Sequence, residues 1–103
     1  YSRCLVIGVA TPLLLIASWY GPGFHGNLTA NGTRYDQQSS TAAHKSLPFG
    51  TRLRVCLRSC EVVTITDRGP FIPGRDLDLS MGTAQRIGLI DRGVDQVKVT
   101  RLN

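Results

Sequence analysis

The chain has 103 residues, enough for one small domain but not for two. Its net charge of +5 favours anionic partners, such as a wall polymer or an anionic membrane surface. The sequence has no run of lysine and arginine, and its aromatic residues do not alternate with basic ones, so nucleic acid is not a predicted partner.

The first segment, residues 1–17, has Arg3 followed by an uncharged stretch of 14 residues. This stretch is too short for a confident membrane-spanning helix, and Pro12 interrupts it. A positive residue before a short apolar segment is typical of the end of a secretory signal. Leu13 to Tyr20 also fits a first strand, and both interpretations can hold. We expect export to the periplasm, cell envelope or exterior, membrane contact only through this segment if it is not cleaved, and a monomeric folded domain over residues 18–103.

Residues 18–26 combine glycine and proline with four flat side chains, those of Trp19, Tyr20, Phe24 and His25. Such a loop holds flat surfaces in fixed positions, which suits stacking on sugar rings. The alternative is a strand in which neighbouring side chains point to opposite faces. We expect Trp19 in the core and the other three at the surface.

Short stretches with β-branched or alternating apolar residues predict strands separated by turns. These stretches are Thr41–Lys45, Arg52–Val55, Glu61–Thr66 and Val94–Leu102. Ser80 is a plausible N-cap for one short helix over residues 81–87, which Gly88 ends. Many short strands and one helix predict an all-β fold, a closed barrel.

Cys56 and Cys60 are separated by three residues, a spacing that suits a disulfide across a tight hairpin. A metal site is the alternative, but it requires further ligands, and the two histidines, His25 and His44, stand alone. We therefore predict the disulfide, no metal and no cofactor. Cys4 is left over in the segment expected to be removed or embedded.

Asp67 follows the strand that ends at Thr66, just before Arg68-Gly69-Pro70 breaks the pattern. A strand end delivers a side chain from a rigid platform into a loop, a common location for a catalytic acid. Asp67 is also well suited to cap the turn through its carboxylate. The local sequence leaves both interpretations open.

Seven short motifs occur in the order found in the rare lipoprotein A family, which the chain resembles from about Ala17 to Leu102. They are ASWYG at 17–21, FHG at 24–26, TANG at 29–32, TAAH at 41–44, LPFGT at 47–51, TDRGPF at 66–71 and DLDLS at 76–80. The resemblance implies a six-stranded double-psi β-barrel, related to that of expansins. It also implies a lytic transglycosylase that acts on peptidoglycan glycan strands, especially those stripped of peptides.

The implied reaction cleaves the β-1,4 bond between N-acetylmuramic acid and N-acetylglucosamine and leaves a 1,6-anhydro end. Because the sugar's own C6 hydroxyl attacks, one carboxyl group can protonate the leaving oxygen and then accept the hydroxyl proton. Asp67 matches the family's catalytic aspartate, and this role requires a raised pKa. His44 matches a histidine of the family's groove, where it would hydrogen-bond the sugar or tune Asp67, unless it is only structural.

Asp78 matches the aspartate of the superfamily's Asp-Leu-Ser element, either beside the groove or as an anchor for loops through backbone hydrogen bonds. Arg68 and Arg75 are expected to pair with Asp76 or Asp78, or to meet carboxylates on the glycan. The residues expected to contact the glycan are Tyr20, Phe24, His25, Thr29, Asn31, Thr33, Arg68 and Phe71.

The chain departs from the family pattern at Thr33, where the family usually has a glutamate after Asn-Gly. A hydroxyl neither donates a proton as a carboxylic acid does nor stabilises an oxocarbenium ion by charge. The alternative function is therefore a non-catalytic, expansin-like module that binds wall polysaccharide. A secreted effector or inhibitor on the same barrel is a third reading, which no motif supports.

Overall fold

The structure, a computed structural model, describes residues 13–20 and 24–103. The predicted signal segment lies mostly outside this part of the chain, as do Cys4 and the Gly-Pro-Gly at 21–23. No helix among the described residues has the length and apolar character needed to cross a membrane.

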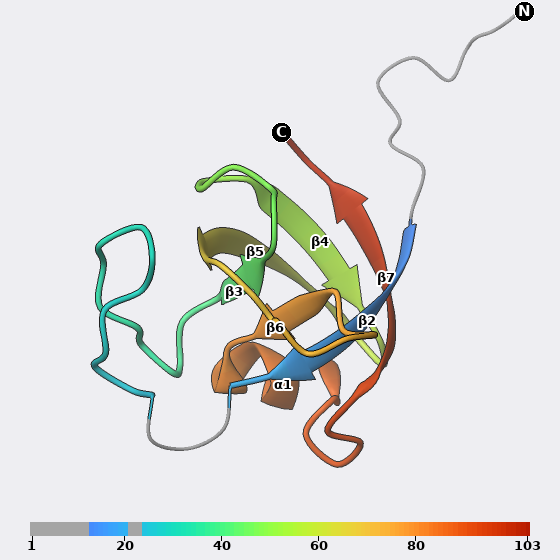
Figure 1. The fold of residues 1–103 in the computed structure, drawn as a ribbon. Coiled ribbons are helices and arrows are strands. Elements are labelled where there is room, and N and C mark those ends of the chain that lie inside the picture. The colour runs from blue at the N-terminus through green and yellow to red at the C-terminus, as the bar shows by residue number, and fades with distance from the viewer. Residues whose placement is uncertain (1–12, 21–23) are drawn as a thin grey trace, which may run out of the picture.

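Six strands close into a barrel in the order β2-β6-β3-β5-β4-β7 (Figure 1). Their bounds are β2 Leu13–Trp19, β3 Thr41–His44, β4 Arg52–Cys56, β5 Cys60–Asp67, β6 Leu77–Leu79 and β7 Asp95–Arg101. β2 runs parallel to β6, and β3 runs parallel to β5, whereas the other neighbouring strands are antiparallel. The predicted closed barrel is confirmed.

Alternation along the strands explains which side chains fill the barrel. In β4, Leu53 and Val55 are buried between exposed arginines, and β7 buries Val97 and Val99 in the same way. The small Ala17 and Ala42 complete this core, together with leucine and isoleucine side chains of the other elements. Trp19 is half-buried and packs against the core, and Tyr20 is half-buried too rather than at the surface.

The helix α1, Met81–Ile87, begins and ends as the sequence predicts. The hydroxyl of Ser80 accepts the backbone N–H of Thr83, and Gly88 takes a left-handed conformation, with its N–H on the carbonyl of Ala84. The sequence did not reveal β6, because a three-residue strand is too short to show alternation.

A disulfide joins Cys56 to Cys60, which lie directly opposite each other where β4 turns into β5. The predicted pairing is confirmed. The disulfide closes the hairpin at the start of β5, and Asp67 lies at the end of the same strand.

Glu61 ties β5 to α1 and to the segment before β3. Its carboxylate accepts hydrogen bonds from Arg86 at 2.5 and 3.0 Å, from Thr83 at 2.7 Å and from Ser40 at 2.8 Å. The bonds from Arg86, opposed by burial, hold the pKa of Glu61 below its ordinary value of 4.5. Arg86 also donates to the carbonyl of Gln38, so the cluster fixes the end of the long loop that precedes β3.

We predict that Glu61→Gln lowers the free energy of unfolding by about 1–3 kcal/mol at neutral pH, because it weakens several charge-assisted hydrogen bonds. A carboxyl group whose pKa is lowered by folding stabilises the fold above its unfolded pKa and loses this effect as the pH falls through the folded one. The difference from the parent should therefore shrink below about pH 4 in urea unfolding curves. Asp91→Asn is the control, since Asp91 is 82% exposed and lies 4.0 Å from Arg58. Equal losses in both variants would contradict the prediction.

Candidate functional site

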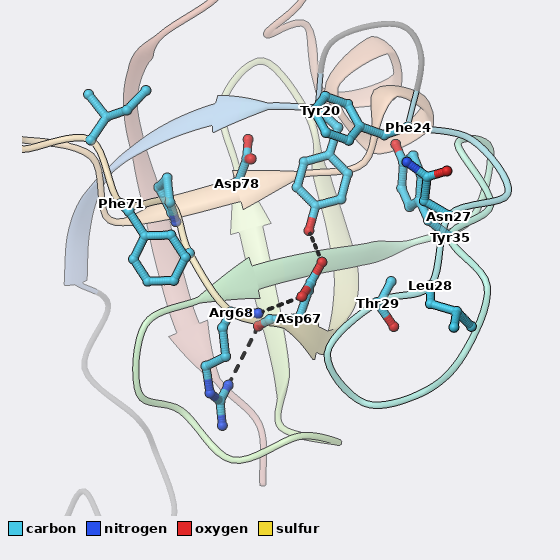
Figure 2. Close-up of a pocket in the computed structure, with 13 residues that line it drawn as sticks. Tyr20, Phe24, Asn27, Leu28, Thr29, Tyr35, Asp67, Arg68, Phe71 and Asp78 are labelled. Atoms are coloured by element: carbon cyan, nitrogen blue, oxygen red, sulfur yellow. Dashed lines mark hydrogen bonds between the residues drawn. The ribbon is translucent and has the colours of Figure 1, made fainter.

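A cavity of about 460 Å³ lies against the outer wall of the barrel, where β2, β5 and β6 meet the loops around residues 24–35 and 68–72 (Figure 2). It holds two carboxylates, those of Asp67 and Asp78. The other lining residues are Tyr20, Phe24, Asn27, Leu28, Thr29, Tyr35, Arg68, Gly69, Pro70, Phe71 and Ile72.

A shift in strand register brings Asp67 to this wall. Val63 and Ile65 point into the core, so strict alternation would send Asp67 inward as well. The pairing with β3 shifts by one residue, however: Ala42 lies opposite Ile65, but Ala43 lies opposite Asp67. This β-bulge turns Asp67 to the outer face, an effect that bulges often have beside active sites.

Ala43 also pairs with Asp78 on its other side, so the two aspartates flank one alanine in a single row across three strands. Two strand spacings separate their backbones by about 10 Å. The alanine side chain is small and buried, with 1% exposed, and it is not among the residues that line the cavity. Asp78 is outward because its neighbours Leu77 and Leu79 are core residues.

The Asp67 carboxylate accepts three hydrogen bonds from three parts of the chain. Oδ2 accepts the hydroxyl of Tyr20 at 3.0 Å, which Figure 2 shows pointing down from the end of β2. Oδ1 accepts the backbone N–H of Ala30 at 2.9 Å and that of Arg68 at 2.8 Å. The bond from Arg68 comes from the next residue, so it is not the Asx hydrogen bond expected from the sequence, which would come from the residue after that.

Asp78 is half-buried and accepts fewer hydrogen bonds than Asp67. Its Oδ1 accepts the hydroxyl of the buried Ser18 at 3.2 Å. Burial raises the pKa of Asp78 to about 6, which the Ser18 bond and the charge of Arg75 oppose and the charge of Asp67 reinforces. At near-neutral pH, Asp78 therefore carries a proton for part of the time.

Tyr20 lies at the centre of an aromatic group beside the two carboxyl groups. Its ring meets Tyr35 edge-on, with 4.7 Å between centroids, and lies 5.8 Å from Phe24. Burial and the charge of Asp67 raise the pKa of Tyr20, so its hydroxyl remains a donor. The hydroxyl of Tyr35 in turn accepts the backbone N–H of Met81, which connects the cavity wall to the start of α1.

Arg68 lines the cavity with its guanidinium fixed at one end. Nη1 donates to the carbonyls of Leu47 at 2.8 Å and of His44 at 3.3 Å, and the group lies 4.1 Å from the ring centroid of Phe49. Within the described residues, Nε and Nη2 donate to no protein group, so they are available to an anionic ligand.

The amino-acid sequence of this region is similar to that of known proteins. A family model described as lytic transglycolase matches residues 14–99. The chain belongs to that family. The match covers every strand but the first residue of β2 and the end of β7.

Relatives of this lytic transglycolase domain include proteins named endolytic peptidoglycan transglycosylase RlpA. The chain is 59% identical over 85 residues to a probable one from Synechocystis sp., covering 80% of the chain and 26% of the relative. It is 51% identical over 87 residues to that of Campylobacter jejuni, covering 82% and 32%. The chain thus spans about a quarter to a third of the length of these relatives.

A solved structure, the Streptomyces papain inhibitor (SPI), has the same fold, with a TM-score of 0.69 over 90% of this chain and 96% of that one. At 18% identity the likeness concerns the fold alone. With the strand order, it confirms the predicted six-stranded double-psi barrel.

Seven of the residues predicted for the site line the cavity of this domain: Tyr20, Phe24, Thr29, Asp67, Arg68, Phe71 and Asp78. His25, Asn31, Thr33 and His44 do not. Asn31 and Thr33 instead serve the loop, since Asn31 Oδ1 accepts the hydroxyls of Thr29 at 2.6 Å and of Thr33 at 2.7 Å. His25 Nδ1 accepts the backbone N–H of Gln37.

For two sets of charged residues, the structure disfavours one of the two alternatives that the sequence left open. The anchoring of a backbone N–H belongs to Asp76, whose Oδ2 accepts that of Ile16 at 2.9 Å, whereas Asp78 bonds a side chain. Arg68 and Arg75 form no ion pair within 4.0 Å among the described residues. The partners of Asp76 and Asp78 are set by the position of β2 beside β6, and nothing in the local sequence distinguishes the two aspartates.

Sequence reasoning missed Tyr35 as a cavity residue, although it is 95% buried beside Tyr20. An aromatic residue within a polar loop was the available signal. In residues 13–20 and 24–103, no three His, Cys, Asp or Glu side chains are grouped so as to hold a metal ion.

We predict that Asp78→Asn stabilises the domain by about 1–3 kcal/mol at pH 7 and has little effect near pH 4. The folded-state pKa of Asp78 lies above its ordinary value of 3.8, so the folded state holds the proton more tightly and stability falls as the pH rises from about 4 to 6. Asparagine stays neutral and avoids this loss.

Urea unfolding at both pH values measures the effect, and a carboxyl NMR titration measures the midpoint of Asp78 directly. A midpoint near 3.8, with no gain in stability at pH 7, would overturn the assignment.

Proposed function

We propose that this domain is an exported lytic transglycosylase that cleaves peptidoglycan glycan strands between N-acetylmuramic acid and N-acetylglucosamine and leaves 1,6-anhydro ends. One observation carries the proposal: Asp67 and Asp78 flank Ala43 in one cavity, with the Tyr20 hydroxyl on Asp67. Family membership and relatives named for peptidoglycan transglycosylase activity support the substrate class.

The reaction needs one group that gives a proton to the leaving oxygen and one that takes the proton of the C6 hydroxyl. The sequence predicts Asp67 for both. The raised pKa of Asp78 supports giving it the donor role, because it holds a proton near neutral pH. The Asp67 carboxylate, which accepts three hydrogen bonds, then accepts the hydroxyl proton and stabilises positive charge on the sugar ring.

The protons balance without a water molecule as a reactant. Asp78 loses its proton as the bond from C1 to the leaving oxygen breaks, and Asp67 gains one as the C6 oxygen bonds to C1. Exchange with solvent through the open cavity returns both carboxyl groups to their starting states. Water enters only in this reset, so the product is an anhydro sugar rather than a reducing end.

Exposed apolar side chains surround the two carboxyl groups and provide surfaces for sugar rings. Phe71 is 78% exposed, and Phe24, Ile72 and Leu28 are exposed as well. The free nitrogens of Arg68 suit a carboxylate on the glycan. The net charge of +5 also favours an anionic ligand.

Thr33 bears less on activity than the family pattern implies. Its hydroxyl bonds Asn31 and lies outside the cavity, so it takes no part in proton transfer. Asp78 supplies the second carboxyl group instead, which favours the enzyme over the non-catalytic wall-binding module.

We predict that incubating the 103-residue chain with peptide-stripped glycan yields products with 1,6-anhydro ends, measured by mass spectrometry. Asp67→Asn and Asp78→Asn should each lower the rate at least about a hundredfold, the usual size of an acid–base contribution. Asp91→Asn, whose side chain is exposed and outside the cavity, is the control and should match the parent.

Products with reducing ends would instead mean hydrolysis, with one aspartate activating water. No product at all, with binding to insoluble wall material retained, would leave the binding module as the function.

We further predict that the rate constant for cleavage falls as the pH rises above about 6, because the donor Asp78 must be protonated. Rates measured from pH 5 to 8 on soluble glycan check this. A rate that rises across that range would exclude Asp78 as the donor and return both transfers to Asp67.

A further inference from the structure

His44 and the two carboxyl groups lie on opposite faces of one short strand. In β3, Ala43 faces outward between Asp67 and Asp78, so the next residue, His44, faces inward. Its ring borders a hollow of about 260 Å³ formed mostly by inward leucine and valine side chains of β2, β4 and β7. A glycan bound at Asp67 is therefore separated from this ring by the strand itself.

The imidazole closes the turn that follows β3. Nδ1 accepts the backbone N–H groups of Ser46 and Leu47, each at 3.1 Å. A ring nitrogen that accepts two N–H groups carries no proton, so the proton of the neutral ring is on Nε2. Burial lowers the pKa of His44 and favours this neutral form.

This turn is also the support for Arg68. The two carbonyls that accept Nη1 belong to His44 and Leu47, the first and last residues of the turn, and Phe49, two residues further on, packs against the guanidinium. The backbone N–H of Arg68 bonds Asp67. A change in the conformation of the turn would therefore move the side chain of Arg68, a residue that lines the cavity.

We propose that His44 is a positioning residue that acts through the 44–47 turn to hold the guanidinium of Arg68 at the glycan cavity. It makes no contact with the glycan and transfers no proton to it. The kinetic consequence rests on the proposed function, whereas the structural connection does not.

Two substitutions separate this role from direct chemistry. In His44→Asn, the side-chain oxygen takes the place of Nδ1 and can accept the same N–H groups, as asparagine does in turns. In His44→Gln, the amide group extends to the place of Nε2, and the acceptor at Nδ1 is lost. Positioning predicts that asparagine preserves function and glutamine does not, whereas a role for Nε2 on the substrate predicts the reverse.

Kinetics on soluble peptide-stripped glycan give the first measurement. We expect His44→Asn to remain within about threefold of the parent and His44→Gln to raise KM about tenfold with a smaller change in kcat, because ground-state binding through Arg68 is weakened. In an Arg68→Met background, His44→Gln should add no further effect. Loss of activity in a folded His44→Asn, or a full additional loss in the double variant, would overturn the proposal.

NMR gives a second measurement that does not depend on activity. Hydrogen exchange at the Ser46 and Leu47 amides should be slow in the parent and in His44→Asn, and fast in His44→Gln. The Arg68 Nε–H resonance should keep its parental chemical shift in His44→Asn and move in His44→Gln. Thermal unfolding confirms that each variant is folded. Unchanged exchange in His44→Gln would refute the connection, whereas slow parental exchange without any glycan product would refute only the proposed function.

Discussion

The register shift at the end of β5 decides what the outer wall of the barrel can do. Without it, Asp67 would continue the inward series of Val63 and Ile65 and place a carboxylate in an apolar core, at a large cost in desolvation. With it, the carboxylate meets three donors from distant parts of the chain. The backbone carbonyl of Thr66, at the shift, accepts the N–H of Asn31, so the loop over the cavity is attached at the same point.

The same wall contains two carboxyl groups in contrasting surroundings. Asp67 is surrounded by donors, whereas Asp78 is half-buried with one hydroxyl and the negative charge of Asp67 nearby. Burial raises the pKa of Asp78, and a raised pKa is what a carboxyl group needs in order to hold a proton near neutral pH. The raised pKa also costs stability at neutral pH, which is the usual relation between a functional site and the fold that carries it. This cost falls on β6, which carries Asp78, whereas the Glu61 hydrogen bonds and the disulfide hold β5, which carries Asp67.

Structural features that depend on neighbouring residues could be predicted from the sequence. Alternation in β4 and β7, the Ser80 and Gly88 caps and the Cys56–Cys60 hairpin all follow from neighbouring residues. The bulge at the end of β5 could not be predicted, because the alternation of residues up to Ile65 does not show where the register with β3 shifts. For the same reason, the sequence did not reveal the partners of Asp76 and Asp78, since each accepts a hydrogen bond from a residue of β2 that lies 60 positions away. The order of the motifs predicted most of the polar residues that line the cavity, whereas the pairing of β3 with β5 and β6 determines how these residues are placed.

Strand β3 explains how four residues can serve both the core and the cavity. Ala42 fills the barrel, and Ala43 lies buried between the two acids on the other face of the strand. A larger residue at 42 would overpack the core. His44 then ends the strand by bonding its own turn. Positions 42 to 44 are therefore explained by the two faces of one strand: Ala42 and His44 lie on the face toward the barrel interior, and Ala43 lies on the face of Asp67 and Asp78.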